Sequence, residues 1–156
     1  MLQQLQKDFN GHLTQAIVDA QQLQSTLNLE YEYLKKNNLQ AFQELQARKQ
    51  HDVQTIQLFD ALRNQFCTNA GIDREDKNFS HHLPLPDQAQ WQQLLGLLKD
   101  CDKLHRTSDL FMRTKLESIS KALETLELNS PMTSTNLYNN LGNSFKSNKG
   151  RSLYKA

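Results

Sequence analysis

Apolar residues recur every three or four positions along most of this 156-residue chain, and this period decides which folds it can adopt. The spacing is that of one face of an α-helix, with glutamine and charged residues on the other faces. A helix with a single apolar stripe must bury that stripe against a neighbouring element. The first run comprises Leu2, Leu5, Phe9, Leu13, Ala16, Ala20, Leu23, Leu27, Tyr31 and Leu34.

The first run ends at a short polar segment whose residues suit the end of one helix and the start of another. Lys35 and Lys36 are favourable in a last helical turn because they face the negative end of the helix dipole. Asn37 can adopt the left-handed conformation that closes a helix, and Asn38 is a good N-cap for the next one. We therefore predict a turn at Asn37 and Asn38.

A second helix is expected to follow this turn. Lys49 interrupts its apolar stripe, and we expect the stem of this lysine to lie along the stripe with its ammonium group in water. The apolar face of this helix comprises Phe42, Leu45, Val53, Ile56, Phe59, Leu62 and Phe66.

A third helix is expected after the loop 71–87, which holds one glycine and two prolines and should be the longest loop of the bundle. Asp87 is the expected N-cap, so that the helix begins near Gln88. Its apolar surface has two adjacent seams and is wide enough to contact two neighbours. The main seam comprises Trp91, Leu94, Leu98, Cys101, His105, Ser108, Met112, Leu116, Ile119, Leu123 and Leu126, and the second comprises Leu97, Leu104 and Phe111.

These runs predict an all-α protein, an up-down bundle of three long antiparallel helices. The helices are expected at about 1–36, 38–70 and 88–128. Residues 1–130 would form the helical bundle. Residues 131–156, which begin near a helix-stopping proline, would form a flexible or short-helical C-terminal tail.

The residues capable of chemistry do not form a catalytic or metal-binding pattern. His81 and His82 are adjacent in the loop but lack further ligands at metal-binding spacing. His105 lies on an apolar seam, where a partly buried histidine with one hydrogen bond is expected. Cys67 and Cys101 have no motif spacing and are expected to be free thiols in a reducing compartment. We therefore predict a protein that is not an enzyme and that has no metal and no cofactor.

The charge and hydropathy of the chain argue against nucleic acids and membranes as partners. The first residues contain no apolar core of a signal peptide, and no stretch approaches the length of a membrane-spanning helix, so a cytoplasmic location is expected. Four basic residues and no acidic ones follow Glu127, but they are scattered. Binding to nucleic acid or direct insertion into a membrane is therefore not expected.

The tail has one feature that a merely flexible segment does not need. Leu137, Leu141 and Phe145 lie four residues apart, with Tyr138 beside them, in a stretch rich in asparagine and serine. A helix this short is not stable alone, so we expect these residues to fold against a partner protein. The alternative is that the tail packs on its own bundle as a short fourth helix, and the two arrangements can coexist.

Several motifs resemble those of the FlgN-type flagellar type III export chaperones. The stretch "LEYEYLKKNNLQAFQELQARKQHDVQTIQLFDAL" is similar to the family pattern of a Leu-and-Glu segment, a capping residue and Leu-rich repeats, with Asn38 as the cap. The tail sequence "YNNLG", from Tyr138 to Gly142, resembles the "YxxxG" motif of the family. The third helix departs from the pattern, because His105, Ser108 and Asp109 stand where Asn, Asn and Gly are typical.

The resemblance implies a cytoplasmic chaperone that binds hook–filament junction proteins before export and delivers them to the membrane export gate. It implies no cofactor, no chemical step and a monomer or small homo-oligomer. The residues expected to bind partners are Leu137, Tyr138, Leu141 and Phe145. The alternative function is that of a structural coiled coil or self-associating helical bundle, which would not need apolar residues in a flexible tail.

Overall fold

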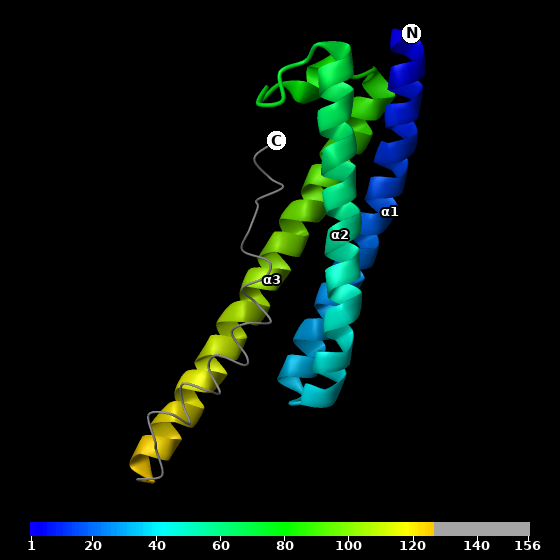
Figure 1. The fold of residues 1–156 in the computed structure, drawn as a ribbon. Helices are drawn as coiled ribbons and strands as arrows, with labels where there is room; N and C mark the ends of the chain where they lie inside the picture. Colours follow the sequence, from blue (N-terminus) through cyan, green and yellow to red (C-terminus); the bar gives the residue numbers. More distant parts are fainter. Residues whose placement is uncertain (127–156) are drawn as a thin grey trace.

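The computed structural model of the chain describes residues 1–126, and these fold as three long helices joined by one turn and one loop (Figure 1). The elements are α1 (Leu2–Lys35), α2 (Leu39–Ala70), a short 3₁₀ helix η1 (Phe79–His82) and α3 (Leu85–Thr125). The described residues include no strand, and the predicted all-α class is confirmed.

The turn between α1 and α2 lies where the capping residues predicted it. Asn37 has a φ of 56°, the left-handed conformation that ends a helix. The N–H of Asn38 donates to the carbonyl of Tyr33 at 2.9 Å. The side-chain oxygen of Asn38 then accepts from the N–H of Ala41 at 3.2 Å, so Asn38 caps α2 as predicted.

The loop that connects α2 to α3 also begins with a left-handed residue. Gly71 has a φ of 70°, and the N–H of Ile72 donates to the carbonyl of Cys67 at 2.8 Å. The prediction for the start of α3 was wrong by one turn, because Pro84 is the N-cap and Asp87 already lies inside the first turn. Pro86 lies in that first turn, where a proline is tolerated because the backbone N–H groups have no helical partner.

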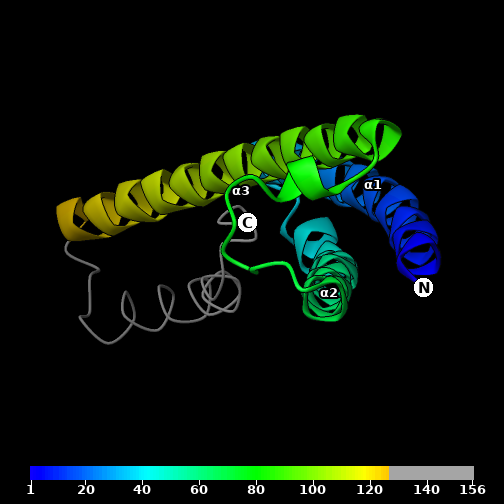
Figure 2. The same ribbon diagram turned by 90° about the horizontal axis from the view of Figure 1, so that it is seen from above.

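The three helices are arranged with α1 packed against both of the others. The backbones of α2 and α3 each run close to α1 along much of its length, whereas α3 diverges from α2 toward its C-terminal end (Figures 1 and 2). Aromatic side chains bridge the remaining gap, as where the rings of Phe59 and Trp91 lie 6.4 Å apart. The wide apolar surface of α3 therefore contacts two neighbours, as its two seams predicted.

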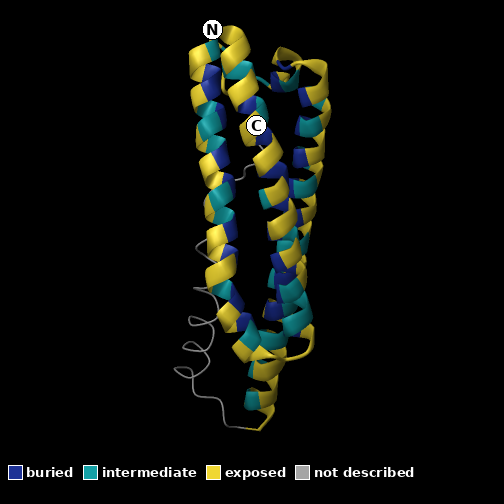
Figure 3. Ribbon diagram, turned by 90° about the vertical axis from the view of Figure 1, so that its right-hand side faces the viewer, coloured by how far each residue is buried: buried dark blue, intermediate teal, exposed yellow. Residues whose placement is uncertain are grey.

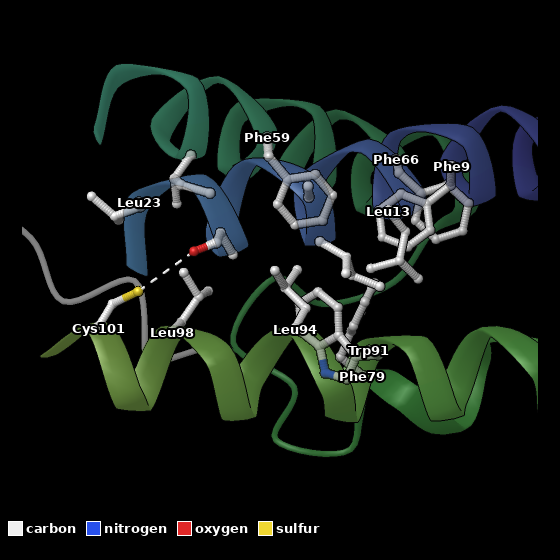
Figure 4. Packing of buried hydrophobic residues seen from close by; sticks show 14 of the residues in the cluster. Phe9, Leu13, Leu23, Phe59, Phe66, Phe79, Trp91, Leu94, Leu98 and Cys101 are labelled. Atoms are coloured by element: carbon white, nitrogen blue, oxygen red, sulfur yellow. Dashed lines mark hydrogen bonds between the residues drawn. The ribbon is translucent and has the colours of Figure 1, made fainter. Parts of the chain in front are cut away.

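The buried residues line the inward faces of the helices in two groups (Figure 3). The larger group contains an aromatic cluster in which the rings of Phe9 and Phe66 stack at 4.5 Å and those of Phe79 and Trp91 meet edge to face at 4.9 Å (Figure 4). Phe79 comes from η1, so the loop closes this end of the bundle. The smaller group, near the α1–α2 turn, is formed by Leu34, Phe42 and Met112.

The helices do not all end at the same level. Lys115 reaches the C-terminal end of α1, where its ammonium group donates to the carbonyl of Leu34 at 2.8 Å and also contacts the side chain of Asn37. Beyond this point α3 continues past the α1–α2 turn, with no other described helix beside it (Figure 1). We call residues 116–126 the overhang. The apolar seam of α3 is therefore longer than the apolar stripes of α1 and α2 that pack against it.

Candidate functional site

The four residues predicted to bind partners, Leu137, Tyr138, Leu141 and Phe145, lie outside the described residues. The structure therefore leaves their role a prediction. What it does describe is the bundle to which that segment is attached, with its cysteines and histidines, its buried polar groups and its exposed apolar side chains.

Within residues 1–126, no group of three or more histidine, cysteine, aspartate or glutamate side chains could hold a metal ion. The ring of His82 lies 2.8 Å from a carboxylate oxygen of Asp76. That contact lowers the pKa of the Asp76 carboxyl, chiefly through the hydrogen bond with His82. Both side chains are partly exposed in the loop, so they stabilise the turn rather than form a site.

The two cysteines lie free in the interior and are poor nucleophiles. Burial raises the pKa of the Cys101 thiol to about 12, and its Sγ is 3.7 Å from the carbonyl oxygen of Ala20 (Figure 4). Burial likewise raises the pKa of the Cys67 thiol. Because the thiolate is the reactive form, both side chains act as small apolar residues at neutral pH.

A buried layer of polar side chains separates the two apolar groups of the core. The ammonium group of Lys49 on α2 lies 2.9 and 3.1 Å from the two carboxylate oxygens of Glu30 on α1. Gln46 donates to the same carboxylate at 3.0 Å, and the Nδ1 of His105 on α3 lies 3.3 Å from the Lys49 nitrogen. We call these four residues, Glu30, Gln46, Lys49 and His105, the polar layer.

The expectation for Lys49 was wrong. Its side chain is only 3% exposed and that of Glu30 is fully buried, so the ammonium group is not in water. A buried charge needs an opposite charge and hydrogen bonds, and here a second helix supplies them. Glu32, two residues from Glu30, faces another side of α1 and pairs with Lys35 at 2.8 Å.

His105 is half-buried and held near Lys49, as its place on the seam predicted. Burial lowers the pKa of its imidazole, and the neighbouring Lys49 charge lowers it further, while Glu30, Asp102 and Asp109 act in the opposite direction. The neutral ring can accept a hydrogen bond from the lysine through Nδ1. The polar layer combines an imidazole, a carboxylate and an ammonium group, but Glu30 and Lys49 are closed to solvent, so a substrate cannot reach them.

Exposed large apolar side chains occur on all three helices, and two of them, Ile119 and Leu126, lie on the overhang. Leu116 packs partly against the smaller core group, but farther along the same helix Ile119 is 50% exposed and Leu126 is 64% exposed. Leu123 lies between them and is half-buried. These four residues, Leu116, Ile119, Leu123 and Leu126, follow the 3-4-3 spacing of one helix face, and we call them the overhang face.

A pocket of about 300 Å³ lies at the base of the overhang, where α3 passes the α1–α2 turn. Lys115 forms part of its wall, with its ammonium group 4.8 Å from the centre of the Phe111 ring. The rest of the lining is supplied by Asn37, Thr114, Ser118 and Ile119. The pocket and the overhang face adjoin, because Ile119 belongs to both.

Two of these features were missed from the sequence. Glu30 lies three residues after Leu27 and four before Leu34, on the stripe itself, just as Lys49 lies on the stripe of α2. Opposite charges on the stripes of adjacent helices are a signal for a buried pair, and the sequence contains this signal. The overhang could not be predicted from the sequence, because apolar periodicity gives no information about where a neighbouring helix stops.

Comparison with protein-family models found a match to one described as FlgN protein, over residues 1–144. Comparison with curated proteins found no match, and comparison with solved structures found none either. No described helix is long and apolar enough to cross a lipid bilayer.

Proposed function

Because the chain belongs to the FlgN family of flagellar export chaperones, we propose that it binds hook–filament junction proteins through its C-terminal segment. It would hold them in an export-competent form in the cytoplasm and deliver them to the membrane export gate. The family is one of chaperones rather than enzymes, and the closed polar layer and unreactive cysteines of the bundle accord with that.

The observation that carries the proposal is the extent of the family match. It continues past the end of α3 at Thr125 and includes Leu137, Tyr138 and Leu141. Residues 131–144 of the tail are therefore part of the family match, which ends just before Phe145. A segment of this composition gains stable structure only by burying its apolar residues against another surface.

The bundle would act as the scaffold for the tail. Its core is closed at one end by Phe79 and contains the buried Glu30–Lys49 pair, so we expect the bundle to fold without the tail. Leu137, Leu141 and Phe145 would form one face of a helix on the junction protein. Tyr138, displaced by about 100° on that helix, would contact the export gate.

Co-purification from cells tests this division of roles. The full chain should retain candidate junction proteins, and the chain lacking residues 131–156 should lose them while keeping its helical content. Tyr138→Ala should keep much of the substrate binding but reduce export of the junction proteins. Retention of the junction proteins by the truncated chain would contradict the proposal, because the bundle alone would then be the binding site.

A further inference from the structure

We propose that residues 137–145 cover the overhang face in the free protein, docked on α3 as a short antiparallel helix. The inference concerns the segment already proposed to bind the substrate and adds its regulation. The tail would have two alternative partners, the overhang face of its own chain and the junction protein. Only the part about the substrate rests on the proposed function.

Beyond Leu116, which packs partly against the smaller core group, the overhang face has no other helix beside it among the described residues. Over about 15 Å of helix, it presents Ile119 and Leu126 half or more exposed, with Leu123 between them. A soluble helix ordinarily keeps such a face against a neighbour. The helices that cover the rest of the α3 seam stop at the α1–α2 turn, so the cover must come from elsewhere.

The position of the tail in the chain favours it as that cover. Residues 127–156 follow the overhang directly, and ten residues, 127–136, separate Leu126 from Leu137. Ten residues can span up to ~34 Å, whereas two packed helices lie only about 8–10 Å apart. The linker is therefore long enough to reverse direction. Because the tail is tethered, its effective concentration at the overhang is on the order of millimolar, well above that of a separate chain.

The two apolar faces match in length and direction. Leu137, Leu141 and Phe145 span about 12 Å as a helix, which fits within the overhang face. In the antiparallel orientation Leu137 would lie nearest Leu126, and Phe145 nearest Leu116. The asparagines at 139 and 143 would then lie on the opposite side of the tail helix and face water.

This arrangement would regulate substrate binding. A junction protein that uses the same three tail residues must first displace them from the overhang face. The cover therefore lowers the apparent affinity of the chain for the junction protein. It would also keep two apolar surfaces out of water in the absence of substrate. Once the tail has bound the substrate, the overhang face is exposed and can contact another protein.

Hydrogen exchange on the free, full-length protein tests the cover without any substrate. We compare the intact chain with the double substitution Leu141→Asp and Phe145→Asp, and use Asn139→Asp with Asn143→Asp as a control of equal charge on the opposite side. The amides of residues 119–126 should exchange at least about fivefold faster in the first variant and unchanged in the control. The amides of the α1 core serve as the internal reference for an intact bundle.

Equal exchange in all three proteins would overturn the proposal. Protection of the overhang that increases with protein concentration would also overturn it, because a second copy of the chain would then be the cover. A second measurement substitutes the overhang face itself, as Ile119→Ser with Leu123→Ser. Affinity for a junction protein should rise at least about threefold as the competitor is removed. A fall in affinity would instead make the overhang face a substrate surface and contradict the cover.

The two proposals can fail independently. If the exchange result is as expected but no junction protein binds the chain under any condition, the cover stands and the proposed substrate is wrong. If the junction protein binds through the tail but the overhang exchanges equally fast in every variant, the proposed function stands and the cover is wrong.

Discussion

Lys49 shows how much one residue can decide in a thin core. Its ammonium group is bonded to both oxygens of Glu30, and neither side chain reaches solvent. Removing one member of a buried pair leaves the other charge without compensation, which costs about 3–5 kcal/mol. Lys49→Met should therefore destabilise the protein by about that amount in urea-induced unfolding.

The double substitution Lys49→Met with Glu30→Leu is the matched control for that experiment. It removes both charges and fills the space with apolar groups, so most of the lost stability should return. A loss of less than about 1 kcal/mol for Lys49→Met alone would show that the pair is not closed to water.

His105 should make the stability depend on pH. Burial and the Lys49 charge lower the pKa of the folded-state imidazole below its ordinary value near 6.5, so the unfolded chain binds a proton more readily. The contribution of His105 to the free energy of unfolding is therefore complete above about pH 6.5. It is lost as the pH falls from there through the folded-state pKa. Glu30, Asp102 and Asp109 oppose the effect but do not reverse its sign.

Melting temperatures measured between neutral and mildly acidic pH test this directly. The fall in melting temperature on acidification should be smaller in His105→Gln than in the unchanged protein. His51→Gln is the control substitution, because His51 lies exposed on α2 and outside the polar layer. An identical pH profile for His105→Gln and the unchanged protein would contradict the account of the polar layer.

At the scale of single elements, the helix ends were largely predictable and the helix surroundings were not. Asn38 and Gly71 mark the ends of helices through local backbone chemistry, which the sequence carries in full. The start of α3 was misjudged because an aspartate suits a first helical turn as well as a cap, and Asp87 lies in the turn and accepts from Asn10 on α1 at 2.6 Å. That contact between distant segments is invisible to local patterns.

Two glycines give an element-scale prediction with opposite signs. Gly71 has a φ of 70°, which costs an alanine about 1–2 kcal/mol although no atom stands within 4 Å of the added methyl group. Gly96 lies exposed within α3 and is equally open, so alanine there should stabilise the helix by up to ~1 kcal/mol.

The measurement is the melting temperature of each single substitution. It should fall for Gly71→Ala and rise for Gly96→Ala, by a few degrees in each case for a chain of this size. A rise for Gly71→Ala would show that the left-handed cap is not needed to end α2.

At the scale of the whole molecule, the proposed function assigns different roles to the bundle and to the tail. Apolar periodicity predicted three helices and their class because each stripe is a local property of the chain. The buried Glu30–Lys49 pair and the overhang depend on which helix lies beside which and where each one stops. Both are tertiary features, which the local pattern of a single helix does not contain.

The central claim is that the tail binds the substrate while the bundle only carries it. The most direct test is the affinity of a purified junction protein for the full chain and for Leu141→Ala with Phe145→Ala, with Asn139→Ala and Asn143→Ala as the control pair. The account predicts a loss of at least about tenfold, or ~1.4 kcal/mol, for the first pair only, with a melting temperature within about a degree of the unchanged protein. Unchanged affinity, or a loss accompanied by a fall of several degrees in melting temperature, would contradict it, since the tail would then be either uninvolved or a fourth helix of the core.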